Sequence, residues 1–273
     1  RHWGVGDLSI EERYIKAIDA GIDQFGGEKD TEVVIELVKK SLIPLSRIDA
    51  SVKRILKNKF DLGLFDDPYV EVDQVKSRVN TERNIKLGKE AQKQSMVLLK
   101  NDSTLPLEKN INIFVDGFNA KSIVHGNVVS DIKDADVIVS YVHTVFNGNQ
   151  PSGIDRLVDN VLSSIFPNQD LNFSPEILEK LEKFSLIKPL IIIVDLNRPA
   201  ILDSINQMSS ALVGTFGVDE SVIFETLFGE SKPTGKLPFE IPSSMKEVNE
   251  QLEDVPDDTL NPTFKFGFGL TYP

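Results

Sequence analysis

The spacing of apolar residues changes character once along this chain, near residue 96. Before that point apolar residues recur every three or four positions, the spacing of one face of a helix. Ser9 with Glu12 three residues later forms a capping box, which favours a helix starting at Ser9. We predict a helix from Ser9 to about Ala20, a short strand at 20–25, a helix at 31–41, and a helix N-capped by Ser46 after Pro44 that runs to Phe60.

After residue 96 the apolar residues form nearly continuous runs. Such runs are typical of strands that are buried on both faces of a parallel sheet. The stretches between the runs have helical spacing, and Ser174-Pro175-Glu176 is a helix start with proline at the first helical position. The alternation predicts an α/β fold with a doubly wound, mostly parallel sheet. The predicted strands are 96–99, 111–115, 137–142, 190–194 and 211–216, and the predicted helices are 81–95, 155–164, 174–185, 200–207 and 219–229.

Two segments lack any period. Residues 61–80 contain Gly63, Pro68 and several acidic side chains, which predicts a linker that crosses a surface. Residues 230–273 are rich in proline, glycine and aromatic side chains, which predicts an irregular but ordered tail.

Composition narrows the function classes. The 273 residues carry a formal net charge of -12 and no basic cluster, which makes the chain a poor ligand for nucleic acid or an anionic membrane. No apolar run approaches the roughly 20 residues that a membrane span needs. The chain has no cysteine, which removes disulfides and thiol chemistry. That absence slightly favours a cytoplasmic location, although the compartment stays open.

Residues that could carry chemistry are sparse. The histidines are isolated, and His143, at the end of an apolar run, is best interpreted as a strand-end histidine. The chain has neither a glycine-rich phosphate loop nor a metal-binding motif, so we expect no cofactor and no metal. Asp195 and Arg198 follow a predicted strand at its carboxyl end, where α/β sheets bind ligands, although a pair that only holds the loop is the simpler interpretation. The residues alone predict a soluble α/β domain with a small-molecule site, and they name no reaction.

Four motifs, taken in order, add a family resemblance. They are Lys57–Tyr69 with its Gly-Leu-Phe-Asp-Asp-Pro, Ser95–Asn101, Gly235–Pro242 and Phe264–Tyr272. This ordered set resembles glycoside hydrolase family 3, the retaining β-glucosidases and their relatives. In that family a (β/α)₈-type barrel domain is followed by a linker and an α/β sandwich.

The resemblance implies three parts. Residues 1–60 are similar to the C-terminal part of the barrel domain, 61–80 to the linker, and 81–273 to the sandwich domain. Two helix–strand units cannot close a barrel. We therefore expect this chain to start partway through the protein, with the remaining barrel domain as its partner.

The family mechanism that the resemblance implies uses two carboxyl groups. The nucleophile is an aspartate in a Ser/Thr-Asp motif on a barrel strand. That motif is expected upstream of Trp3, and neither Asp7 nor Asp23 fits it. The nucleophile is therefore expected outside this chain.

The acid/base is normally a glutamate, and the resemblance places it within residues 166–173. This chain has Asn168, Gln169 and Asp170 there, and no glutamate. Asp170 is the candidate acid/base, with a side chain one methylene shorter, and Glu28 and Glu220 are alternatives. Loss of proton donation costs about 10²–10⁴-fold in rate.

The substrate-binding candidates are Gln24, Glu28, Asn168 and Gln169. Gln24 and Glu28 lie at the carboxyl end of the predicted strand 20–25, where barrel sites form, although a solvated loop glutamate is the simpler interpretation of Glu28.

The expected function is a retaining, exo-acting β-glycosidase that acts on terminal β-linked sugars, with β-glucosides favoured. The alternative is a catalytically weak or inactive carbohydrate-binding relative, motivated by the missing glutamate. A weaker idea is that residues 81–273 are a structural domain that mediates a homodimer.

Overall fold

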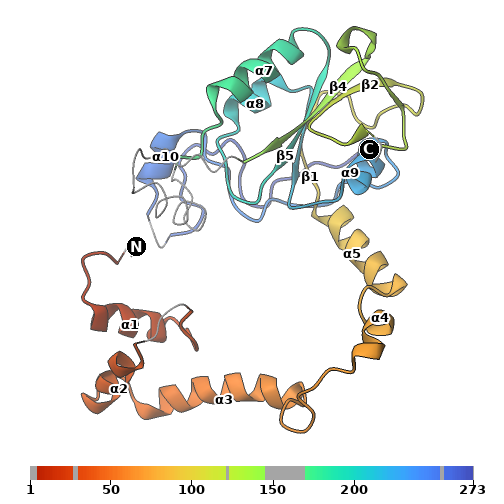
Figure 1. The fold of residues 1–273 in the computed structure, drawn as a ribbon. Coiled ribbons are helices and arrows are strands. Elements are labelled where there is room, and N and C mark those ends of the chain that lie inside the picture. Colours follow the sequence, from red (N-terminus) through yellow and green to blue (C-terminus); the bar gives the residue numbers. More distant parts are fainter. Residues whose placement is uncertain (1–4, 27–29, 121–122, 145–169, 253–254, 273) are drawn as a thin grey trace, which may run out of the picture. The chain divides into compact units, whose positions relative to one another are not determined.

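The computed structural model describes residues 5–26, 30–120, 123–144, 170–252 and 255–272. The chain forms two compact units, Arg1–Val79 and Asn80–Pro273, whose elements are labelled in Figure 1. In the ranges just given, no helix is long and apolar enough to cross a membrane.

The first unit is helical and has a small apolar core of Ile18, Leu37 and Ile43. The predicted capping box is confirmed, because the backbone N–H of Ser9 donates to the Glu12 carboxylate at 2.8 Å and the N–H of Glu12 donates to the Ser9 hydroxyl at 3.3 Å. The helices are α1 Ile10–Asp19, α2 Thr31–Lys39 and α3 Leu45–Asp61.

The short strand predicted at 20–25 is wrong, because residues 20–21 form a turn, residue 24 a bend, and none of the six is in a strand. A strand needs its carbonyls for a neighbouring backbone. Here the Arg47 guanidinium donates to the carbonyl of Ile22 at 3.1 Å and to that of Ile18 at 2.8 Å. Gly21 has φ +101°, a left-handed conformation that leaves the extended region altogether.

The third helix starts after Pro44 as predicted, but its predicted N-cap is wrong. Helix α3 begins at Leu45 with Pro44 as its N-cap, so Ser46 lies inside the first turn. The carbonyl of Pro44 already accepts a backbone hydrogen bond from Arg47 at 2.9 Å, which leaves Ser46 no capping role.

Helix α3 ends at a left-handed glycine, Gly63, with φ +70°. The backbone N–H of Leu64 donates back to the carbonyl of Lys59 at 3.0 Å, the closure expected at a glycine helix end. The predicted linker then contains two short helical turns. These are the 3₁₀ helix η1 Val72–Gln74 and α4 Val75–Arg78.

The second unit contains a six-stranded sheet in the order β1-β6-β5-β4-β2-β3. Strand β1 pairs with β6 in the antiparallel sense, and the other pairs are parallel, which confirms the predicted mostly parallel α/β fold. The sequence missed β3, which is only two residues long and exposed. The strands are β1 Val97–Asn101, β2 Asn112–Asp116, β3 Asn127–Val128, β4 Val137–His143, β5 Leu190–Asp195 and β6 Ala211–Thr215.

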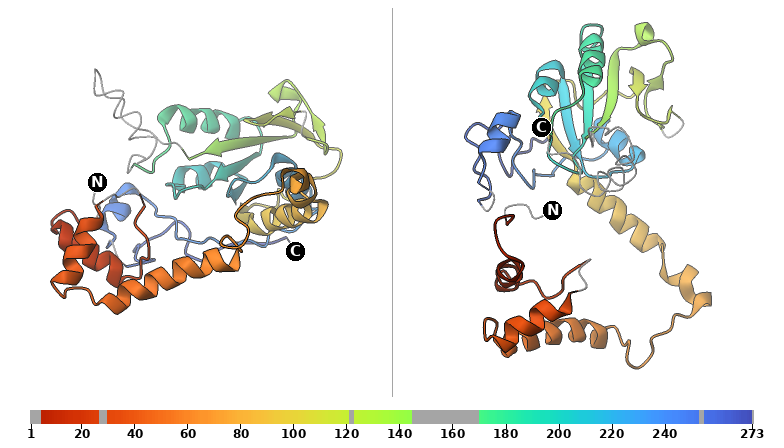
Figure 2. Two further views of the ribbon diagram at one scale, coloured as in Figure 1. Left: turned by 60° about the horizontal axis from the view of Figure 1, so that its bottom comes forward. Right: turned by 60° about the vertical axis from the view of Figure 1, so that its left-hand side comes forward.

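Helices cover both faces of this sheet, as Figure 2 shows. Along β5, Ile191 and Ile193 pack in one apolar cluster with the side chains of α9. The intervening Ile192 and Val194 pack in a second cluster with α7 and α8. Burial on both faces explains the continuous apolar runs of the sequence. The helices are α5 Glu82–Ser95, which contacts α9, then α7 Pro175–Ser185, α8 Asp203–Met208 and α9 Glu220–Leu227.

The tail is ordered and mostly irregular, as predicted, with one short helix, α10 Met245–Glu250. Its last residues pair with the sheet through the isolated bridge Leu98–Leu270. Tyr272 is buried, and its hydroxyl donates to the carbonyl of Thr226 at 2.8 Å. Burial raises the pKa of the Tyr272 hydroxyl. The tail motif Phe264–Tyr272 therefore fastens the tail to β1 and α9 of the second unit.

A substitution at Gly235 tests the contact between the tail and β1. A Cβ at Gly235 would lie 2.6 Å from the carbonyl oxygen of Met96 and 2.7 Å from that of Ser95. Because both atoms are backbone, the tail or β1 must shift. We predict that Gly235→Ala lowers the free energy of unfolding by about 1–3 kcal/mol in chemical denaturation. The control is Gly88→Ala on α5, where nothing lies within 4 Å of the new Cβ and a gain of up to about 1 kcal/mol is expected. Equal effects of the two changes would contradict the close approach.

Candidate functional site

The carboxyl ends of β2, β4, β5 and β6 meet at one edge of the sheet. After β2 the chain adds β3 on one side, and it then returns to place β4 on the other side. Ligands of open α/β sheets bind outside the carboxyl ends of the strands, at such a reversal of strand order. The edge beside β2 and β4 is therefore where topology favours a site.

Asp195 is the most enclosed charged group at this edge. It ends β5 with a side chain that is 8% exposed. The backbone N–H of Gly217 donates to its Oδ1 at 3.2 Å, and the side-chain amide of Asn197 donates to its Oδ2 at 2.6 Å. The Nδ1 atom of His143, the last residue of β4, lies 3.5 Å from the same Oδ2. The sequence favoured structural roles for both residues, a strand-end histidine for His143 and a loop-holding pair for Asp195 with Arg198, and the structure brings His143 and Asp195 together.

Tyr141 packs beside this pair. Its ring centroid lies 4.5 Å from that of His143 in an edge-to-face arrangement. Burial, and then the negative charge of Asp195, raise the pKa of the Tyr141 hydroxyl. Tyr141 is therefore a neutral group at neutral pH.

Two other acids at the edge accept hydrogen bonds from neighbouring segments. Asp116, at the end of β2, accepts hydrogen bonds at 2.7 Å from the Ser140 hydroxyl and from Lys180 of α7. Glu220, one of the acid candidates from the sequence, begins α9 and accepts the backbone N–H of Asn119 at 3.2 and 3.3 Å. Both carboxyl groups therefore act as hydrogen-bond acceptors in the folded chain.

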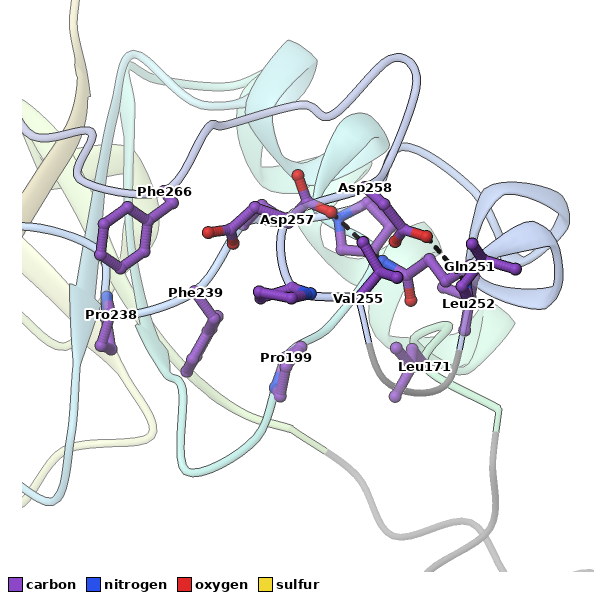
Figure 3. Close-up of a pocket in the computed structure, with 14 residues that line it drawn as sticks. Leu171, Pro199, Pro238, Phe239, Gln251, Leu252, Val255, Asp257, Asp258 and Phe266 are labelled. Atoms are coloured by element: carbon purple, nitrogen blue, oxygen red, sulfur yellow. Dashed lines mark hydrogen bonds between the residues drawn. The ribbon is translucent and has the colours of Figure 1, made fainter. Parts of the chain in front are cut away.

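A pocket of about 610 Å³ opens between the loop after β5 and the tail (Figure 3). Phe239 and Phe266 present rings to it, and Asp257 and Asp258 present carboxylates. The fourteen described residues of its lining include no basic side chain. Aromatic and proline surfaces with a few polar acceptors suit a neutral, hydroxylated ring. The lining residues are Leu171, Pro199, Pro238, Phe239, Glu240, Pro242, Val248, Gln251, Leu252, Val255, Pro256, Asp257, Asp258 and Phe266.

The sequence did not predict this pocket. Its walls come from short, irregular segments that are far apart in the chain, and no period marks them. One feature of the sequence could have indicated the pocket, namely the prolines that cluster with Phe239 and Phe266 in the tail motifs. From the sequence alone, these motifs are assigned structural roles only.

The predicted site residues are only partly described. Glu28, Asn168 and Gln169 lie outside the described residues. Gln24 is exposed in the first unit. Asp170 is exposed, and its Oδ1 accepts the backbone N–H and the side-chain amide of Asn172 at 2.9 and 2.8 Å, the geometry of an Asx turn.

Asp170 is adjacent to the pocket in sequence, because the next residue, Leu171, lines the pocket. Burial lowers the pKa of the nearby Arg198, and the charge of Asp170 opposes that shift. No group of three or more potential metal ligands occurs among the residues for which side chains are described.

The architecture is that of an α/β domain with a ligand-sized pocket beyond the carboxyl ends of its strands. Residues 125–272 match the family model described as the glycosyl hydrolase family 3 C-terminal domain. The chain belongs to glycoside hydrolase family 3, as its motifs predicted.

Relatives extend the similarity over the whole chain. It is 37% identical to "Probable beta-glucosidase C" of Aspergillus oryzae, over 100% of this chain and 42% of that protein. It is 36% identical to "Periplasmic beta-glucosidase/beta-xylosidase" of Dickeya chrysanthemi, over 99% of this chain and 41% of that protein. The chain thus spans about two fifths of the length of these relatives.

Solved structures agree on the fold. The β-glucosidase from Listeria innocua in complex with glucose matches with a TM-score of 0.60 and 20% identity, covering 96% of this chain and 44% of its own. A β-glucosidase involved in saponin metabolism from intestinal bacteria matches with a TM-score of 0.62 and 18% identity, covering 97% and 48%.

Asp23, excluded as a nucleophile by its motif, holds the first unit together. Its carboxylate accepts two hydrogen bonds from Arg54, at 2.7 and 2.6 Å, and one from the Ser51 hydroxyl at 2.7 Å. These hydrogen bonds lower the pKa of the Asp23 carboxyl. Because its carboxylate is hydrogen-bonded to Arg54 and Ser51 in the folded chain, Asp23 has a structural role.

The pKa shift makes a pH prediction. Because the pKa of Asp23 is lower in the folded than in the unfolded chain, its stabilisation is present above the unfolded pKa of about 3.9 and is lost as the pH falls further. We expect Asp23→Asn to destabilise the first unit at pH 7 and to flatten its loss of stability between about pH 4 and pH 2. Chemical denaturation at each pH, followed by helix circular dichroism, measures both slopes. Parallel slopes for the two proteins would contradict the assignment.

Proposed function

We propose that the polypeptide to which this chain belongs is a retaining, exo-acting β-glycosidase that hydrolyses terminal β-linked sugars, with β-glucosides favoured. The observation that carries the proposal is the 36–37% identity, over essentially the whole chain, to proteins named β-glucosidase and β-xylosidase. The pocket supports it, since its ring-lined and acidic surface suits an uncharged sugar.

The proposed mechanism divides the work between two parts of the polypeptide. Residues 1–60 belong to the barrel domain, 61–80 to the linker and 81–273 to the sandwich, a division supported by the separate compactness of Asn80–Pro273. The nucleophilic aspartate lies in the barrel domain outside this chain, and it forms a covalent glycosyl-enzyme. The second domain supplies the group that protonates the leaving oxygen and then activates water, about 5–5.5 Å from the nucleophile when both are carboxylates.

Asp170 is the carboxyl candidate for that second group. Its exposure and its place beside the pocket-lining Leu171 support the role. Its Asx turn argues for a loop-building role instead, because one carboxylate oxygen is already taken by Asn172.

A sugar-binding relative with weak hydrolysis is the second candidate. It is favoured by the absence of glutamate from residues 166–173. Calorimetric binding of a sugar, without turnover of any aryl glycoside, identifies this alternative. A homodimer mediated by residues 81–273 also stays a prediction, which light scattering tests.

The first test is a panel of nitrophenyl α- and β-glycosides with the complete polypeptide. We expect turnover of one β-glycoside, β-glucoside first, and NMR of the initial product should show the retained β-anomer. The present 273 residues alone should show no turnover, since they lack the proposed nucleophile. An inverted product, or turnover by these residues purified alone, would contradict the mechanism.

The pocket makes a separate prediction. Phe266 is 59% exposed, so Phe266→Ala should cost little stability. Loss of ring contact with a bound sugar should raise KM by about 2–10-fold with kcat nearly unchanged, the pattern of lost ground-state binding. Leu186→Ala, an exposed apolar truncation away from the pocket lining, is the control. Identical KM values for Phe266→Ala, the control and the wild type would remove the pocket from the substrate path.

A further inference from the structure

We propose that His143, oriented by Asp195, is the proton donor and acceptor of the glycosidase reaction, in the role that the family gives to a glutamate. This inference rests on the proposed function and deepens it.

The sheet itself fixes the pair. His143 and Asp195 are register partners, the last pair of the β4–β5 ladder. Their relative position therefore follows from six consecutive parallel pairs and does not depend on a loop. The Nδ1 atom of His143 faces Asp195 at 3.5 Å, which leaves Nε2 as the nitrogen on the far side of the ring.

Burial differs sharply between the two partners. The Asp195 side chain is 8% exposed and the His143 side chain is 67% exposed. Gly217 and Asn197 already hold the aspartate in place, so the histidine is not needed to satisfy it. The exposed imidazole can therefore meet a ligand, while the buried Asp195 stays fixed beside it.

The hydrogen bonds of the other acids also favour this histidine. Asp116 already accepts a hydrogen bond from Lys180, and Glu220 accepts the backbone N–H of Asn119. The reaction needs one group that first donates and then accepts a proton, and an imidazole nitrogen can do both.

The chemistry balances with no further reactant. As the barrel aspartate bonds to the anomeric carbon, the glycosidic C–O bond breaks with its electron pair on oxygen, and that oxygen takes the proton from Nε2 of His143. Neutral His143 then accepts a proton from water as the water oxygen attacks the anomeric carbon and releases the aspartate. Asp195 touches no substrate and acts as a positioning residue that stabilises the imidazolium.

The test compares leaving groups on the complete enzyme. The substrates are two β-glycosides of one sugar, with a 2,4-dinitrophenyl group that leaves unprotonated or an alkyl group that needs a proton. His143→Gln should lower kcat/KM by about 10²–10⁴-fold on the alkyl glycoside, and by less than about tenfold on the dinitrophenyl glycoside. Azide should raise kcat of this variant on the dinitrophenyl glycoside and give the glycosyl azide, because azide needs no general base. Asp195→Asn should show the same dependence on the leaving group, with a smaller loss.

The matched control is His125→Gln. His125 also lies 3.5 Å from a carboxylate, that of Glu230, but it precedes β3 and is away from the carboxyl edge. It should lose no activity on either substrate. A loss in His143→Gln that is equal for both leaving groups, or absent, overturns the inference, as does the leaving-group dependence appearing in Asp170→Asn instead. If the wild type hydrolyses neither substrate, the proposed function fails first and this inference fails with it.

Discussion

The parallel ladder of β2, β4, β5 and β6 is the constraint on which the second unit depends. Each strand is covered on both faces, so its side chains pack alternately into two separate apolar clusters. At the carboxyl ends the alternation continues after the apolar residues stop. On the α7 face Asp116 accepts hydrogen bonds from Ser140 and Lys180, whereas His143 and Asp195 continue the row that packs toward α9. The polar side chains at the carboxyl edge thus follow the same two-sided alternation as the apolar side chains of the strands.

Sequence reasoning predicted the elements whose signal is local. Continuous apolar runs marked five strands, because double-sided burial leaves no alternation to misread. The capping residues Ser9 and Ser174 marked helix starts for the same local reason. Sequence reasoning failed at residues 20–25. There Arg47 donates a hydrogen bond to the Ile22 carbonyl, which a strand would need, and the two residues are more than twenty positions apart. It missed β3, whose two residues are too short to show any period.

The arrangement at the sheet edge could not be predicted from the sequence. There His143 was interpreted as a strand-end histidine and Asp195 as part of a pair that holds a loop, and only the register of β4 against β5 makes them neighbours. The pocket was out of reach, because residues as distant as Pro199 and Asp257 line it and each sits in an irregular segment. Asp170 is a candidate through the family resemblance alone. Its Asx turn with Asn172 is a feature of the folded chain that was not predicted from the sequence.

The proposed division of catalytic groups between two domains puts a particular demand on the second domain. A proton donor that must meet a nucleophile on another domain gains from a rigid base, because small misplacements of a catalytic group cost large factors in rate. Asp170 lies in an Asx turn with Asn172. His143 is instead placed by the register of β4 against β5, and its partner Asp195 is held by Gly217 and Asn197. On this argument, the sheet edge can compensate for a loop that lacks the family's glutamate, and the dependence on the leaving group separates the two arrangements.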